Sequence, residues 1–265
     1  MVFAVIASGS MTFALSRLSV ATQKIASGDF DVRVDIQTGG EIGLLATGFN
    51  AMAVEVSRLM RETADKARME SELATAKAVQ DTLFPEPNAT IGPVEISGHY
   101  TSASECGGDW WHYCENGDYV YIWIGDATGH GAPAALLTSA ARAVASVITQ
   151  APPMPVGECL GILNRAICES SKGKMMMTFF LAIIDKNNGW LSYSNASHEP
   201  PFLLRKNDGE PKRDDFLPMN EVNNPRLGER TDHEYKQAMV QLAPGDTVVF
   251  YTDGVVDVKS PEGKS

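Results

Sequence analysis

The stretch Gly125-Asp126-Ala127-Thr128-Gly129-His130-Gly131 is the part of the chain that most constrains the fold. It follows an alternating apolar run at 119–124, typical of a strand, and precedes an apolar run at 134–147, typical of a helix. An acidic residue between a strand and a glycine-rich turn brings a carboxylate and open backbone close to a small ligand. A tight strand-to-helix turn with an acidic cap would produce the same pattern, so this stretch alone leaves both interpretations open.

Two other turns carry the same kind of signal. Gly107-Gly108-Asp109 lies upstream, and Thr252-Asp253-Gly254 follows a strand-like run at 247–251. Each is only a turn signal by itself. If the three aspartates converge in space, their oxygens would suit magnesium or manganese, because both ions prefer oxygen ligands.

Five motifs then occur in one order along the chain. They are Ser104–Trp110, Gly125–Ala135, Asn195–Pro201, Arg226–Gly228 and Pro244–Gly254. Together they resemble the PPM-type protein serine/threonine phosphatases, specifically the SpoIIE-type branch, over about residues 80–258. The resemblance implies an αββα sandwich of two antiparallel sheets flanked by helices. The strand-like runs, with a hairpin turn at 185–189, agree with antiparallel sheets.

The resemblance also implies a metal centre. The family holds two divalent ions, manganese or magnesium. Carried over residue by residue, Asp126 would bridge both ions, Asp109 would bind one, and Asp253 would bind the other. The carbonyl oxygen of Ala127 would add a backbone ligand. Two ions ~3.5–4 Å apart generate hydroxide from a bound water near neutral pH, so Asp109, Asp126 and Asp253 are the expected catalytic residues.

The chain departs from the family at its end. The family places a further metal-binding aspartate in a terminal Asp-Asp-x-Thr segment, and nothing between Asp253 and Ser265 resembles it. We therefore expect the phosphatase domain, 85–265, to be incomplete at its C-terminus and to lack one ligand. His130 and His198 are expected to make structural hydrogen bonds rather than to transfer protons.

The N-terminus is apolar. Residues 1–15 contain no charged side chain, and as a helix they would span ~22 Å, less than the ~30 Å of a bilayer's hydrocarbon core. We expect the end of a transmembrane helix there. The start of a buried amphipathic helix is the alternative.

Two heptad seams follow, at 11–25 and 42–59, separated by Gly28-Asp29 and an extended connector with Val32, Val34 and Ile36. Neither seam can bury its apolar side chains alone, so partner helices are expected, most simply from a second copy of the chain. The motifs Gly28-Asp29-Phe30 and Glu41-Ile42-Gly43 resemble the HAMP domain, which implies a parallel dimeric four-helix bundle over 11–60. A generic coiled coil would explain the seams but not these motifs. The charged, alanine-rich segment 61–84 is expected to be a helical linker, ended by Pro85 and Pro87.

Charge and composition narrow the functional class. The chain has 265 residues and a net charge of −11, which argues against a nucleic-acid partner because phosphate neutralisation needs basic clusters. The four cysteines form no C-x-x-C pair, so reduced thiols are expected rather than a zinc site. The predicted class is α+β, with a dimeric HAMP bundle and coiled-coil linker before the phosphatase sandwich.

These patterns predict a membrane-tethered signalling phosphatase. Its substrate would be a phosphoserine or phosphothreonine on a regulatory protein, of the anti-sigma-factor antagonist type that the resemblance implies. It would sit in the inner (cytoplasmic) membrane, with the HAMP and phosphatase domains in the cytoplasm, and form a homodimer through its helices. A HAMP rearrangement would repack the helix at 61–83 and order the metal site. The alternatives are a catalytically inactive dimeric binding module, suggested by the missing aspartate, and a phosphohydrolase of small molecules.

Overall fold

The computed structural model describes residues 2–35, 40–102, 106–207 and 209–255, with side chains from residue 12 onward. The chain forms two compact units, 1–72 and 73–265, which we call the helical unit and the sheet unit. Several predicted features lie outside the described residues. They are the apolar side chains of 1–11, the connector residue Ile36, Ser104 and Glu105 of the first motif, and the C-terminal segment 256–265.

The helical unit consists of α1 (Val2–Ala26) and the first part of α2 (Glu41–Asp81). Helix α1 ends where the sequence predicted, because Gly28 adopts a φ of 95° and the Asp29 amide donates to the Lys24 carbonyl at 2.9 Å. A small core of Ala21, Val34, Phe49 and Ala53 joins the two helices and the connector.

The connector is held by one side chain of α2. Asn50 accepts a hydrogen bond from the Val34 amide at 2.9 Å and donates one to the Val34 carbonyl at 2.9 Å. This two-point contact satisfies an extended backbone as a neighbouring strand would. Helix α2 then continues without a break to Asp81, so the second seam and the predicted linker form one helix.

The sheet unit contains ten strands in the described part of the chain, and every named pair of strands is antiparallel. The strands are β1 (Asn88–Ile91), β2 (Val94–Ser97), β3 (Asp109–Asn116), β4 (Tyr119–Ala127), β5 (Met177–Asp185), β6 (Trp190–Ala196), β7 (Phe202–Leu204), β8 (Phe216–Pro218), β9 (Ala238–Gln241) and β10 (Thr247–Val249). They form a five-stranded sheet in the order β3-β4-β5-β6-β9, a three-stranded sheet in the order β10-β7-β8, and the hairpin β1-β2. Two short 3-10 helices, η1 (Arg213–Asp215) and η2 (Asp253–Val255), complete the unit.

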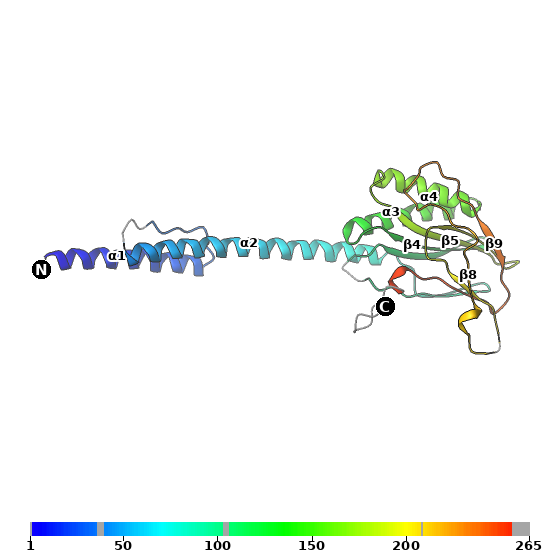
Figure 1. Cartoon of the computed structure of the whole chain (residues 1–265), viewed down its shortest axis with the longest axis horizontal. Coiled ribbons are helices and arrows are strands. Elements are labelled where there is room, and N and C mark those ends of the chain that lie inside the picture. Colours follow the sequence, from blue (N-terminus) through cyan, green and yellow to red (C-terminus); the bar gives the residue numbers. More distant parts are fainter. Residues whose placement is uncertain (1, 36–39, 103–105, 208, 256–265) are drawn as a thin grey trace. The chain divides into compact units, whose positions relative to one another are not determined.

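The five-stranded sheet separates two hydrophobic cores. Helices α3 (Ala132–Gln150) and α4 (Val156–Ser171) lie side by side over one face, where Trp123, Leu160 and Phe179 are fully buried (Figure 1). The opposite face packs against the hairpin and the three-stranded sheet, through side chains such as Leu203 and Val248. We call these the helix-side core and the inter-sheet core. The predicted class, antiparallel sheets flanked by helices after N-terminal helices, is confirmed.

Three local predictions differ from the structure. Strand β3 was not predicted, because its aromatic residues show no clean alternation: Trp110 packs in the helix-side core and Trp111 beside the inter-sheet core. Strand β4 continues through Ala127, into the predicted turn, because β3 pairs with it as far as Asp126 and β5 as far as Ala127. The mostly polar composition of 206–231 predicts an irregular surface segment, yet Asn224 and Leu227 are buried.

One helix among the described residues, α3, is long and apolar enough to cross a membrane by length and composition. Its Ala134, Leu137 and Ala141 belong to the helix-side core, so packing against the sheet accounts for its apolar character. The predicted transmembrane segment, 1–15, stays a prediction, because the side chains of 1–11 lie outside the described part.

Candidate metal centre

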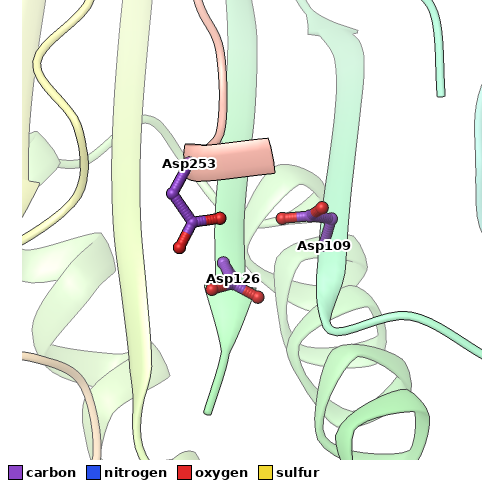
Figure 2. A group of neighbouring side chains, drawn as sticks. All are labelled: Asp109, Asp126 and Asp253. Carbon is purple, nitrogen blue, oxygen red and sulfur yellow. The ribbon is translucent and has the colours of Figure 1, made fainter. Parts of the chain in front are cut away.

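Three aspartates from separate parts of the sequence meet at one edge of the five-stranded sheet. Asp109 begins β3, Asp126 lies near the end of β4, and Asp253 begins η2, and their carboxylates point toward one another (Figure 2). One oxygen from each of the three lies within 4.8 Å of the others. The structure therefore brings together the three aspartates that the sequence singled out.

Strand alternation explains why these side chains share a face. Ile122 and Ile124 lie in the inter-sheet core, so Asp126, two residues further on, faces the same side where that core ends. Asp109 stands directly opposite Asp126 in the register of β3 and β4. Asp253 arrives from the other layer through a tight turn in which the Val255 amide donates to the Thr252 carbonyl at 3.1 Å.

Gly108 allows the backbone to approach this cluster. A Cβ atom at Gly108 would lie 2.5 Å from the Ala127 carbonyl oxygen and 2.7 Å from Asp126 Oδ1, which no side chain could tolerate. The Ala127 amide donates to the Gly108 carbonyl at 3.0 Å. The Ala127 carbonyl oxygen thus lies beside the carboxylates while its methyl group is buried in the helix-side core.

Two carboxylates of the cluster have a raised pKa. Burial raises the pKa of Asp126 to about 7, and the charges of Asp109 and Asp253 add to the effect. Burial likewise raises the pKa of Asp109, although a hydrogen bond from Thr252 opposes the shift. Asp109 Oδ1 is buried and has no hydrogen-bond partner among the described residues. Crowded carboxylates with an orphaned oxygen fit a site for divalent cations, which would neutralise the charge and take up that oxygen.

Comparison with known families agrees with this geometry. The family described as Stage II sporulation protein E (SpoIIE) matches residues 116–265, which is more than half of the chain. This chain belongs to the SpoIIE family of PPM-type phosphatases. The HAMP domain family matches residues 14–58, in the helical unit.

Individual relatives support the same architecture. Protein IcfG of Synechocystis sp. is 26% identical over 275 residues, covering 92% of this chain and 42% of that protein. Phosphoserine phosphatase RsbU of Bacillus subtilis is 28% identical over 195 residues, covering 74% of this chain and 56% of that protein. The chain thus spans about half the length of these curated relatives. The solved SiaA-PP2C domain of Pseudomonas aeruginosa shares the fold, with a TM-score of 0.60 at 22% identity over 76% of this chain and 79% of that one.

The two histidines of the SpoIIE motifs occupy different surroundings. His130 is exposed in the turn after β4. His198 is 5% exposed, its amide donates to Asn195 Oδ1 at 2.7 Å, and its Nδ1 donates to the Glu199 carbonyl at 2.9 Å. Burial lowers the pKa of His198, and the nearby Asp253 charge opposes the shift. His198 therefore makes the structural hydrogen bonds that the sequence predicted.

No sequence pattern predicted a role for Gln80, near the end of α2. Gln80 is 3% exposed within the sheet unit. Its Nε2 donates to the Gly107 carbonyl at 2.7 Å, and its Oε1 accepts from the Gly107 amide at 3.2 Å. These two bonds fix the backbone immediately before Gly108 and Asp109. A single polar residue in a polar helix carries no local signal of such a contact.

Proposed function

We propose that this chain is a metal-dependent protein serine/threonine phosphatase whose HAMP domain regulates its SpoIIE domain. The convergence of three carboxylates at the sheet edge, two of them partly buried, is the observation that carries the proposal. When bound, two divalent ions, manganese or magnesium, would supply an activated water and neutralise charge on the phosphoryl group.

The residues present have distinct parts in this proposal. Asp109, Asp126 and Asp253 would hold the two ions, because one oxygen from each lies within 4.8 Å of the others. The Ala127 carbonyl would add a ligand from the backbone. Gly108 keeps that approach open, and Thr252 orients Asp109 through its hydrogen bond.

The proposed substrate is a phosphoserine or phosphothreonine on a regulatory protein of the anti-sigma-factor antagonist type. The similarity to RsbU, a phosphoserine phosphatase, over 74% of this chain supports it. The described residues of the centre are carboxylates, a threonine and glycines, with no serine or cysteine nucleophile among them.

The helical unit would form a homodimer. Leu44 is 80% exposed, and Leu45 and Met52 are half exposed beside a groove that Leu18 and Phe49 also line. Apolar side chains at heptad positions need partner helices, and a second copy supplies them in a parallel bundle. We further propose that the N-terminal helix anchors the chain in the inner membrane, with both domains in the cytoplasm.

Regulation would act through Gln80. The end of α2 is fixed to Gly107, and Gly107 leads directly into the first metal-binding strand. A rotation or shift of this helix end would move the backbone that places Asp109. The helix would therefore set how well the three carboxylates are arranged.

Manganese-dependent release of phosphate from a phosphoserine protein tests the proposal. We expect release from the phosphoprotein at a higher kcat/KM than from small phosphate esters, and calorimetric uptake of two manganese ions per chain. Metal uptake with preference for the small esters would favour a small-molecule phosphohydrolase. Neither uptake nor release would favour a dimeric binding module instead.

A further inference from the structure

Arg226 extends the row of residues that crosses the sheet at the metal centre. In the strand register, Asp109 stands opposite Asp126, and Asp126 stands opposite Thr178 of β5. The next neighbour at this level is the segment around Leu227, which pairs antiparallel with Met177 through two hydrogen bonds of 2.9 Å. In an antiparallel pair, the residue before Leu227 lies beside the residue after Met177. Arg226 is therefore the fourth member of the row, beside Thr178.

Alternation places Arg226 on the carboxylate side of the sheet. Met177 and Leu227 are both fully buried in the helix-side core, as is Ala127. The residues next to them, Thr178, Arg226 and Asp126, consequently face the opposite side. Neighbouring strands lie ~4.8 Å apart, so the Cα atoms of Arg226 and Asp126 are separated by roughly 10 Å. An extended arginine side chain can cover most of that separation and so reach a phosphoryl group bound over the centre.

The backbone on both sides of Arg226 is fixed by buried hydrogen bonds. Two residues before it, the Asn224 side chain donates to the Asn195 carbonyl at 2.9 Å and accepts from the Lys236 amide at 2.9 Å. Two residues after it, the Gly228 amide donates to the buried Asn164 Oδ1 at 2.9 Å. The position of Arg226 is thus set by the fold, in a segment whose sequence looks like an irregular loop.

The side chain itself remains accessible. The Arg226 side chain is 44% exposed, and its ion pair among the described residues is a 3.8 Å contact with the Glu229 carboxylate. A partly exposed pair at that distance contributes little. A cation on a fixed backbone, in the same row as Asp126, is therefore available for an anion that arrives from solution.

We propose that Arg226 binds the non-bridging phosphoryl oxygens of the substrate. This inference rests on the proposed function and names the residue that recognises the phosphate. A guanidinium presents two parallel N–H groups that match two phosphoryl oxygens, and it offsets the repulsion between the carboxylates and the incoming phosphate. During hydrolysis a water oxygen bonds to phosphorus, the bond to the serine oxygen breaks, and that oxygen takes up a proton. Arg226 keeps its own protons and orients the group.

The test compares Arg226→Ala and Arg226→Lys with Arg230→Ala in the full chain, on a phosphoserine protein and on p-nitrophenyl phosphate with manganese. Arg230 is a matched control, because it is an exposed arginine whose contact with Asn164 uses only its backbone carbonyl. We expect Arg226→Ala to raise KM for both substrates by about 10- to 100-fold, the loss of a charge-assisted contact. Arg226→Lys should recover part of the loss, while Arg230→Ala and the melting temperatures stay unchanged.

Two outcomes would overturn the inference. One is equal KM values for Arg226→Ala and Arg230→Ala. The other is a KM increase confined to the phosphoprotein, which would mean that Arg226 contacts an acidic side chain of the partner and not the phosphate.

Calorimetry with inorganic phosphate in manganese buffer separates this inference from the proposed function. If the unmodified chain hydrolyses neither substrate, the proposed function fails, and phosphate binding then decides the role of Arg226. Binding that Arg226→Ala weakens at least tenfold would support the role. Equal binding by both proteins, or none, would exclude it.

Discussion

The helical unit and the sheet unit differ in how much of their apolar surface one chain can bury. Among the described residues of the helical unit, the buried apolar side chains are mostly alanines, with Val34 and Phe49, while Leu44 and Phe13 are 80% and 64% exposed. In the sheet unit, two cores fill both faces of the five-stranded sheet. One copy of the chain thus buries the apolar side chains at the centre of the sheet unit. The helical unit instead presents an exposed apolar face that partner helices would cover.

In the sheet unit, the destabilising feature is repulsion between carboxylates. Its three aspartates sit close together at the edge of a well-packed sheet, and burial together with their mutual repulsion holds the pKa of Asp126 at about 7. In the proposed function, one unit depends on a second helix pair and the other on cations. The following variants test that division.

Asp126→Asn should have the largest effect. The amide removes the central ligand, so manganese-dependent phosphatase activity should fall by roughly 10³-fold, on the scale of losing a main electrostatic contact in an active site. The metal-free fold should be as stable as before or more so, because a repulsive charge is gone. Initial rates and thermal melts without metal measure both effects.

The matched control is Asp118→Asn, which makes the same change in the exposed turn at the other end of β3 and β4. Its rate should equal that of the unmodified chain. Retained activity in Asp126→Asn would show that Asp126 is not an essential metal ligand.

Phe49→Ala should destabilise the helical unit and leave the sheet unit unaffected. Phe49 is 7% exposed in the small helical core, so its loss should destabilise the helical unit by about 3 kcal/mol. The sheet unit should melt unchanged. Leu44→Ala, at an 80% exposed position, should instead weaken dimerisation in sedimentation experiments without destabilising the helix pair. Equal effects of both variants on dimerisation and on melting would contradict the distinction between core and partner face.

Gln80→Ala should weaken the metal centre without touching a metal ligand. Gly107 loses two hydrogen bonds, and its amide and carbonyl lose a buried partner. We expect manganese affinity to fall roughly tenfold, corresponding to ~1.4 kcal/mol, with activity recovering at high manganese. The neighbouring Val79, 59% exposed, provides the control variant Val79→Ala. A lower rate that excess manganese does not restore would argue against a positioning role.

His112→Phe should have the smallest effect, visible only in acid. Burial, aided by the Arg142 charge, lowers the pKa of His112 from 6.5 to about 4. Between those values the unfolded chain binds the proton and the folded chain does not, so stability is lost as the pH falls. Between pH 7 and pH 5, the His112→Phe variant should therefore lose about 1 kcal/mol less stability than the unmodified chain. Denaturant melts at both pH values measure this, with exposed His99→Phe as control. An identical pH dependence of the two variants would show that His112 does not resist protonation.

Much of the architecture could be predicted because its signals are local. Gly28 ends α1 through a left-handed conformation that glycine adopts at low cost, and Gly189 closes the β5–β6 hairpin in the same way. Helix α3 contains the predicted apolar run at 134–147 and extends it by two residues at the start and three at the end, because apolar periodicity over several turns is a strong signal. The metal-binding roles expected of Asp109, Asp126 and Asp253 came from the resemblance to the phosphatase family.

What the sequence missed depends on pairings between distant segments. Strand β3 exists because Asp109 to Asn116 pairs with β4 and because its aromatic residues find cores on both faces. Gln80 matters because a helix end reaches Gly107, 27 residues further along the chain. Neither contact leaves a pattern in neighbouring residues.

By itself, the sequence determined the order of the elements, the turns and the identity of the acidic residues, because backbone preferences and apolar periodicity are properties of neighbouring residues. The tertiary structure alone decided that the three carboxylates lie within 4.8 Å of one another and that Arg226 stands in the same row. The physical reason is register. One residue of slip in β4 would turn Asp126 to the helix side, and what prevents it is the combined packing of both faces of the sheet.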